Sequence, residues 1–393
     1  MDKTGSVFSM GSGGATYEHN VQAAYLLAMI LKIEIPLVTN GKVSEVAFQT
    51  TSKGYETDDL FVEIDLGSGQ KQKILGQIKH NVALTVANET FNEVVTAFWK
   101  DFNNTEFDKS IDRLLLVKSN LTNNDKKHFS VLLDWASTHK DEIDFYAEVD
   151  RIAIKKQHLD IFETLLKKAN NNKDVSKKDI WMFLKSMALV AFDFTTEAST
   201  SYNNVLNLIT IAKAADCPLT GVQIWSELLT MAATYNQNGG TLTHDDCAQM
   251  DLYKYFNPSV FDTTFESVSK LRTDSGVIIE PFVSTIVDFH LDRSETMKEL
   301  LDTHEKHQIT IVTGNAGVGK SALMKDYLRK HQSTNNVFVF KAEQFNESTL
   351  AQVFARLGIT DSITNIINSI SYLKEALIVI DSLEKLLEAN PEN

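Results

Sequence analysis

The spacing of apolar and polar residues divides the chain into three zones. In the first zone, apolar residues at helical spacing over residues 17–31 follow a Gly/Ser-rich stretch, which predicts a helix capped near Thr16. Short runs rich in β-branched and aromatic residues then alternate with turn residues. These runs predict strands at residues 46–51, 59–66, 72–80 and 113–117, with a helix at residues 88–102 before the last strand. The predicted order is helix, three strands, helix and strand.

The second zone, from about residue 126, has a mostly helical pattern. Apolar residues three and four positions apart predict helices within residues 129–135, 158–166 and 180–189. We expect these helices to elaborate the first zone and to lead through a linker toward residue 290. The pattern therefore predicts a first domain at residues 1–125, a helical elaboration and linker at residues 126–290, and a last domain at residues 291–393.

In the third zone, predicted strands alternate with predicted helices. The strands lie at residues 308–313, 337–340 and 376–380, and the helices lie at residues 295–304, 321–331 and 349–357. Such alternation is typical of a parallel sheet covered by helices on both faces. The sequence therefore predicts an α/β protein.

Composition places the chain among ordinary globular proteins. A hydrophobic content of 43% and a charged content of 23% leave no sign of a disordered chain. Cys217 and Cys247 belong to no CxxC pair, so we expect neither a zinc site nor a disulfide framework, and a reducing cytoplasm fits. The apolar stretch at residues 21–38 is interrupted by Lys32 and Glu34 and follows no basic segment. We therefore expect a buried helix, with no signal peptide, no membrane span and no membrane partner.

The formal charge of −14 argues against a protein that coats nucleic acid over its whole surface. A local basic face is still compatible with this charge. Residues 151–185 contain nine basic residues against four acidic ones, with Trp181 and Phe183 between them. Two interpretations stay open for this stretch: solvated faces of amphipathic helices, which is the commoner case, or a basic face for nucleic acid.

Residues 314–321 read Gly-Asn-Ala-Gly-Val-Gly-Lys-Ser and match the P-loop pattern G-x-x-x-x-G-K-S/T between a predicted strand and a predicted helix. Glycines at such positions allow backbone N–H groups to turn toward phosphate. The lysine can reach the β- and γ-phosphates, and the serine hydroxyl can ligate Mg²⁺. The predicted nucleotide-binding residues are Gly314, Gly317, Gly319, Lys320, Ser321 and Ala322, with ATP and Mg²⁺ as the expected cofactors.

A second acidic residue for the Mg²⁺ of this site is expected at the end of an apolar strand. Residues 377–380 supply that strand and Asp381 follows it, so we interpret Asp381 as the Walker B residue. Glu384 lies three positions later and would have to reach back from a turn to orient a water molecule. The sequence therefore predicts nucleotide binding more firmly than hydrolysis.

The motifs of this zone resemble a STAND-type (AVAST-like) NTPase of bacterial antiviral defence proteins. The resemblance rests on Asp292-Arg293, on residues 310–323, on Val339-Phe-Lys-Ala-Glu343 and on residues 378–386. Such NTPases normally continue with a winged-helix part and a sensor array. The resemblance implies that this chain is the N-terminal portion of a longer protein, that it forms homo-oligomers, and that an absent C-terminal sensor recognises a phage-derived trigger.

The first zone also carries residues suited to metal-assisted hydrolysis. Asp59 and Gln77 lie on the two arms of a hairpin predicted from the turn at residues 67–69. Period-two alternation places Gln77 and Lys79 on one face, so these side chains can meet Asp59 at a sheet edge and share a Mg²⁺ ion. The metal would activate water, and Lys79 would stabilise charge on a phosphate.

This constellation resembles the PD-(D/E)xK nuclease superfamily, whose core is helix, three strands, helix and strand. The likeness includes Gly14-Ala-Thr-Tyr-Glu18, in which Glu18 would face the metal, and the Q-x-K variant Gln77-Ile-Lys79. More narrowly, these residues look like the dsDNA endonuclease effector domain of bacterial anti-phage systems. The resemblance implies Glu18, Asp59, Gln77 and Lys79 as the catalytic set, the first three as metal ligands. Asp58 and His80 are expected to be neighbours that support this set.

Two hypotheses follow from the sequence. The first is an NTP-controlled, Mg²⁺-dependent endonuclease for double-stranded DNA, with a restriction-endonuclease-like core, a helical elaboration and a partial P-loop NTPase domain. The second is a non-catalytic oligomerisation or DNA-docking module with a nucleotide-dependent switch. A motor-driven restriction enzyme is disfavoured, because it requires a full motor domain.

Overall fold

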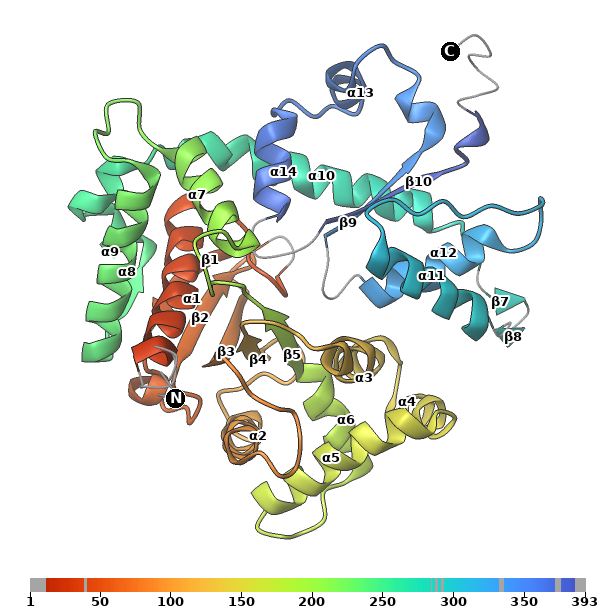
Figure 1. The fold of residues 1–393 in the computed structure, drawn as a ribbon, viewed down its shortest axis with the longest axis horizontal. Coiled ribbons are helices and arrows are strands. Elements are labelled where there is room, and N and C mark those ends of the chain that lie inside the picture. The colour runs from red at the N-terminus through yellow and green to blue at the C-terminus, as the bar shows by residue number, and fades with distance from the viewer. Residues whose placement is uncertain are drawn as a thin grey trace, which may run out of the picture. The chain divides into compact units, whose positions relative to one another are not determined.

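The computed structural model forms two compact units (Figure 1). The first unit comprises Met1–Phe265 with Ile367–Leu373, and the second comprises Glu266–Ile366 with Lys374–Asn393. Within them the structure describes residues 12–38, 41–283, 285–286, 289–290, 293–331, 336–371 and 376–385. Residues on both sides of position 125 belong to the first unit, so the core and most of the predicted helical elaboration fold together.

Helix α1 (Ser12–Leu31) is the central helix of the first unit. Its side chains from position 21 to position 31 are buried on every side. A helix that is apolar all round requires neighbours on all faces. Helix α1 packs against strands β1 (Lys42–Ala47) and β3 (Lys71–Lys79) and against helix α8 (Gly221–Asn238). The prediction of a buried helix is therefore confirmed. In the described part of the chain, no helix combines the length and the apolar character that a membrane span requires.

The first unit is built on a sheet of six strands in the order β5-β4-β3-β2-β1-β6. The strands are β1 (Lys42–Ala47), β2 (Leu60–Asp65), β3 (Lys71–Lys79), β4 (Arg113–Lys118), β5 (Met187–Ala191) and β6 (Thr241–Thr243). Strands β3, β4 and β5 run parallel, and the other neighbours pair antiparallel. The predicted hairpin is confirmed, because β2 and β3 pair around a turn in which Gly67, Ser68 and Gly69 all have positive φ.

Helices cover both faces of this sheet (Figure 1). Alternate residues of β4 show why: Leu115 and Val117 join one core with α1, α7 and α8, whereas Leu114 and Leu116 join the other core with α2 to α6. The α/β class and the order of helix, three strands, helix and strand are therefore present as predicted, with a 3-10 turn (Thr50–Lys53) between β1 and β2.

The helices of the first unit after α1 begin with α2, whose N-cap residue Asn88 accepts a hydrogen bond from the Phe91 N–H. Their bounds are α2 (Glu89–Phe102), α3 (Val131–Thr138), α4 (Glu142–Asp150), α5 (Ala153–Ala169), α6 (Lys177–Ser186), α7 (Thr200–Ala212), α8 (Gly221–Asn238) and α9 (His244–Ala248). A π-helix (Asp125–Ser130) precedes α3, and 3-10 turns (Asp251–Tyr255 and Pro258–Phe261) follow α9.

One predicted helix ends earlier than its pattern indicated. The helical spacing of residues 180–189 continues only to Ser186, and Met187–Ala191 forms strand β5. An apolar run of this length is compatible with either a helix or a buried strand. The open edge of β4 decides the conformation, because it pairs with β5 from Leu114↔Met187 onward.

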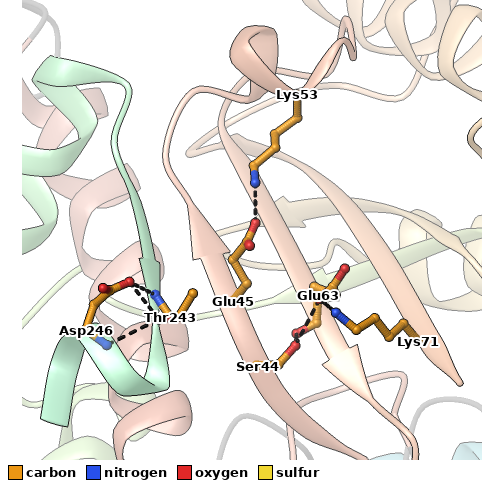
Figure 2. A network of polar contacts seen from close by, with 7 residues as sticks. All are labelled: Ser44, Glu45, Lys53, Glu63, Lys71, Thr243 and Asp246. Carbon is orange, nitrogen blue, oxygen red and sulfur yellow. Dashed lines mark hydrogen bonds and ion pairs between the residues drawn. The ribbon is translucent and has the colours of Figure 1, made fainter. Parts of the chain in front are cut away.

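Polar side chains pair across β1 and β2 (Figure 2). Glu45 and Glu63 lie opposite each other in the ladder, which places two like charges side by side. Lys53 lies 2.5 Å from Glu45, and Lys71 lies 2.6 Å from Glu63, so each carboxylate has its own cation. The adjacent edge strand β6 is only three residues long, which limits pairing with another chain.

The second unit contains a parallel pair of strands, β9 (Asn336–Lys341) and β10 (Ala376–Asp381). Helices α11 (Ser294–Lys306) and α12 (Lys320–His331) share one core with this pair. The remaining elements of this part of the chain are α10 (Asp262–Ile279), β7 (Thr285–Ile286), β8 (Phe289–His290), a 3-10 turn (Ala342–Phe345), α13 (Leu350–Arg356) and α14 (Ile363–Ser371).

Two predictions for this unit were wrong. Residues 308–313 belong to no strand, and their side chains Ile309 and Ile311 are 83% and 71% exposed. The predicted sheet is also not covered on both faces, because Ile378 and Ile380 of β10 are exposed. Alternating apolar residues indicate strand propensity, but a strand forms only where a neighbouring strand satisfies its backbone groups.

Candidate functional site

Hairpin β2–β3 brings three of the predicted residues together. Leu60 pairs with Gly76, so Asp59, directly before β2, lies beside Gln77 near the end of β3. Lys79 is the last residue of β3. Both strands are internal, between β1 and β4, so the group lies at strand ends within the sheet and not on an edge strand.

Asp59 and Lys79 form an ion pair. Lys79 Nζ donates to Asp59 Oδ2 at 2.8 Å, and the Ile78 N–H donates to the same oxygen at 2.6 Å. Burial raises the pKa of Asp59 above its ordinary value, and the Lys79 ammonium and the Ile78 N–H counteract this rise. The carboxylate is thus fixed through one oxygen, while Oδ1 accepts no hydrogen bond from the described residues.

Gln77 is also held in place. Its side chain is 5% exposed, and its Nε2 donates to Asp58 Oδ1 at 2.7 Å. This contact directs the amide nitrogen toward Asp58 and leaves Gln77 Oε1 as the atom that could meet a metal ion. Asp58 therefore contacts a member of the predicted catalytic set, in the supporting position expected for it.

Glu18 comes from α1 and approaches the same group. Its Oε1 accepts hydrogen bonds from Asn236 Nδ2 at 3.0 Å and from Gln22 Nε2 at 3.2 Å. Burial raises the pKa of the Glu18 carboxyl from 4.5 to about 7, and the Asp59 carboxylate adds to this rise. Gln22 Nε2 lies between the two residues, 3.2 Å from Glu18 Oε1 and 2.7 Å from the Asp59 carbonyl oxygen, so the two acids are near neighbours, an arrangement that a bound cation would favour.

Sequence reasoning missed Gln22 and Asn236. Gln22 follows Glu18 by one helical turn, and that spacing could have identified it as a neighbour on the same face. Asn236 lies 218 residues further along the chain, and no local pattern distinguishes it. His80, predicted as a neighbour, packs edge-on against Tyr17 at 5.2 Å, and its carbonyl accepts a hydrogen bond from Ser119.

The donor atoms suit a hard divalent cation. Glu18 Oε2, Asp59 Oδ1 and Gln77 Oε1 accept no hydrogen bond within the described ranges, and Mg²⁺ prefers such oxygen ligands together with water. The described residues contain no group of three or more His, Cys, Asp and Glu side chains placed to hold a metal. Two carboxylates and one amide nevertheless fit Mg²⁺, which commonly uses one or two protein carboxylates.

Three of the nine basic residues in the stretch at residues 151–185 form ion pairs. Arg151, Lys156 and Lys167 form ion pairs with Glu148, Asp150 and Asp174 at 2.7 to 2.9 Å. Two further ammonium groups lie over the rings of Tyr146 and Trp181. These contacts reduce the positive charge that the stretch presents and agree with solvated helix faces.

In the second unit, the P-loop begins α12. Gly314, Gly317 and Gly319 have φ values of 156°, 81° and 91°, which favour glycine. Lys320 Nζ donates to the carbonyls of Gly314 at 2.7 Å and Asn315 at 3.1 Å, so the lysine folds back onto its own loop. The predicted P-loop residues lie together here.

Ser321 and Ala322 continue the helix after Lys320. Ala322 is 6% exposed, so only its backbone could serve a nucleotide. Arg293 belongs to the motif Asp292-Arg293, and its guanidinium lies next to the P-loop. A Cβ added at Gly319 would lie 3.4 Å from that guanidinium. Arg293 also pairs with Asp326 at 3.6 Å. Asp292 and Leu386, other residues of the quoted motifs, lie outside the described residues.

Asp381 ends β10, opposite Lys341 of β9. Its carboxylate accepts a hydrogen bond from Ser382 at 3.2 Å. Within the described residues, no hydrogen bond or ion pair joins Asp381 to Lys320 or Ser321. Glu384 is exposed in the following turn. The structure therefore places the predicted Walker B residue at the end of an apolar strand without linking it to the P-loop.

Comparison with known proteins gives little further information. No protein-family model matches the chain, and no curated protein matches it in sequence. A solved structure of the Acinetobacter baumannii Cap4 SAVED/CARF-domain containing receptor with the cyclic trinucleotide 3'3'3'-cAAA is 12% identical, with a TM-score of 0.33 over 94% of this chain and 71% of that chain. A second structure of that receptor is 12% identical, with a TM-score of 0.35 over 88% and 69%. Similarities at this level establish neither the fold nor the function of this chain.

Proposed function

We propose that the chain is a metal-dependent endonuclease for double-stranded DNA. The observation that carries the proposal is the Asp59–Lys79 ion pair of 2.8 Å at the start of β2 and the end of β3, with Gln22 joining the Glu18 carboxyl to the Asp59 backbone. A phosphodiester hydrolase needs ligands for a divalent cation and a fixed positive charge next to them. Glu18, Asp59 and Lys79 supply both.

Each residue has a distinct role in this proposal. Glu18, Asp59 and Gln77 would hold Mg²⁺ through their oxygens, and the ion would supply a water of lowered pKa at neutral pH. Lys79 stabilises the negative charge that grows on the phosphate oxygens. The water oxygen would bond to phosphorus and release one proton to solvent as the P–O ester bond breaks, and the departing ester oxygen would take up a proton from solvent, so that one water is added across the bond.

The second unit adds nucleotide control to the proposal. The P-loop glycines and Lys320 support ATP binding with Mg²⁺ on Ser321, and Asp381 would complete the metal shell once it approaches the loop. The resemblance to STAND NTPases supports a homo-oligomer that acts in anti-phage defence in the cytoplasm. A phage-derived trigger is the activator that this proposal requires.

Plasmid cleavage tests the proposal. The protein is incubated with supercoiled plasmid and Mg²⁺ or Mn²⁺, next to Lys79→Ala and a control, Lys71→Ala, whose exposed lysine lies at the other end of β3. We expect cleavage by the parent and by the control, and loss of cleavage in Lys79→Ala. Equal cleavage by all three proteins would assign the activity to another site or to a contaminant.

One observation favours the non-catalytic alternative. Lys79 and Gln77 are both engaged by the acids Asp59 and Asp58, so a degenerate nuclease fold could keep these contacts for stability alone. In that case the parent would retard DNA in a gel without cutting it under any metal condition. The same set of proteins therefore separates the two functions.

A further inference from the structure

Helix α8 reaches the candidate nuclease site from a distant part of the chain. Asn236 lies in its last turn, before Gly239, whose φ of 60° ends the helix. Because α8 packs along α1, Asn236 Nδ2 reaches Glu18 Oε1 at 3.0 Å and also lies 3.3 Å from His19 Nε2. The helical elaboration therefore donates a hydrogen bond to Glu18, a predicted metal ligand.

Gln22 connects this contact to Asp59. The side chain is completely buried, and the two hydrogens of its Nε2 are shared among three acceptors, the Asp59 carbonyl at 2.7 Å, Glu18 Oε1 at 3.2 Å and Asn236 Oδ1 at 3.3 Å. Gln22 Oε1 accepts no hydrogen bond among the described residues, so the side chain holds its neighbours through Nε2 alone. Glu18, Asn236 and the backbone of Asp59 are thus held at fixed separations.

The network leaves one side of Glu18 open. Both donors bind Oε1, and Oε2 accepts no hydrogen bond from the residues that the structure describes. A ligand carboxylate that is anchored through one oxygen keeps its other oxygen in a constant orientation. This is the usual role of hydrogen bonds behind a metal ligand.

We propose that Gln22 and Asn236 are positioning residues that orient Glu18 Oε2 toward a divalent cation shared with Asp59. The inference rests on the proposed function, because it requires Glu18 to be a metal ligand. It also assigns a role to α8, which the sequence places outside the nuclease core. A purely structural role, in which the network only ties α8 to α1, makes a different prediction for metal binding.

Calorimetric titration with Mn²⁺ tests the inference in the full chain. Asn236→Ala should weaken Mn²⁺ binding by about 10- to 100-fold, the range typical of residues behind a metal ligand. Asn238→Ala is the control, because Asn238 lies on the same helix, is exposed and bonds only its own helix at Thr234. The control should bind Mn²⁺ as the parent does.

The same substitution made in a Glu18→Gln variant shows whether Asn236 acts through Glu18. In Glu18→Gln, adding Asn236→Ala should change Mn²⁺ affinity by less than about twofold, since the group to be positioned is already lost. Thermal unfolding of every variant verifies that the titrated protein is folded. If Asn236→Ala does not fold, Asn236→Leu keeps a similar side-chain volume without a hydrogen-bond donor and should weaken Mn²⁺ binding as much.

The outcomes separate the inference from the proposed function. Folded Asn236→Ala with parental Mn²⁺ affinity, in a protein whose parent cleaves plasmid, overturns the inference and keeps the nuclease. A parent that neither binds Mn²⁺ nor cleaves overturns both. An equal loss of affinity from Asn236→Ala in the Glu18→Gln background also overturns the inference, because the effect would not pass through Glu18.

Discussion

The two candidate sites of this protein are organised differently. The site in the first unit takes its side chains from α1, the start of β2, the end of β3 and the end of α8, and hydrogen bonds connect all of them. The site in the second unit is a continuous loop, residues 314–321, in which Lys320 bonds to carbonyls of the loop itself. Its acidic residue, Asp381, stands apart at the end of β10.

This difference indicates where each site obtains its geometry. In the first unit, Glu18 and Asp59 are held by the packing of helices on a sheet, so the site depends on the tertiary fold. In the second unit, glycines with positive φ shape the loop locally, and only the approach of Asp381 depends on tertiary structure. Four predictions test this contrast, and they are given from the largest expected effect to the smallest.

Asp59→Ala and Lys79→Ala should separate metal binding from charge stabilisation. We expect both variants to lose cleavage by a factor on the order of 100 to 1000, as when a charge-stabilising group is removed from other hydrolases. Calorimetry with Mn²⁺ should show lost binding in Asp59→Ala and retained binding in Lys79→Ala. Metal binding that survives in Asp59→Ala and disappears in Lys79→Ala would reverse these roles.

Lys320→Ala should weaken nucleotide binding by about 10- to 100-fold, the loss expected for one charge-assisted contact with phosphate. Binding of a fluorescent ATP analogue measures the change. Lys325→Ala, one turn further along α12, is a control outside the loop. Since the P-loop is locally built, Asp59→Ala should bind the analogue as the parent does, and unchanged binding in Lys320→Ala would remove the assignment of the loop.

Cleavage should depend on self-association. If the proposed function holds, a double-strand break needs two sites, so we expect cleavage to require at least a dimer. In the dilute range, a tenfold dilution should lower the rate per protein molecule by about tenfold, and added salt should lower it further. A rate per molecule that stays constant over this range, with a verified monomer, would argue for a constitutive nuclease.

Glu18→Gln should stabilise the metal-free protein at high pH. Folding raises the pKa of Glu18 from 4.5 to about 7, so ionisation favours the unfolded chain, and the parent loses stability as pH rises between these values. The full rise corresponds to about 3 kcal/mol, and partial exposure to water reduces the expected gain at pH 8 to about 1–2 kcal/mol.

Urea unfolding in EDTA at pH 4 and pH 8 measures this effect. Below pH 4.5 the two proteins should have similar stability, because Glu18 is then protonated in both the folded and the unfolded state. The exposed Glu93→Gln on α2 is the control and should change stability by less than about 0.5 kcal/mol at either pH. A Glu18→Gln variant less stable than the parent at pH 8 would contradict the raised pKa.

Most elements of the first zone were predictable because their signals are local, but the strand predicted at residues 46–51 lies at Lys42–Ala47, and a 3-10 turn covers Thr50–Lys53. The hairpin has a Gly-Ser-Gly turn between two runs of β-forming residues, and α2 has Asn88 before its apolar face. The end of α6 was not predictable, because Met187–Ala191 has an apolar pattern that suits a helix or a strand. Pairing with β4 decided between them.

The sequence by itself determined the contiguous features: the P-loop glycines and Lys320, the Gln77-Ile-Lys79 segment, and Glu18 on an apolar helix. These are specified by neighbours a few residues away, through turn geometry and through period-two alternation. Only the tertiary structure decided that Asn236 bonds Glu18, because a contact across 218 residues follows from how α8 packs on α1. Tertiary structure also decided that residues 308–313 form no strand, since a strand exists only where another strand meets its backbone groups.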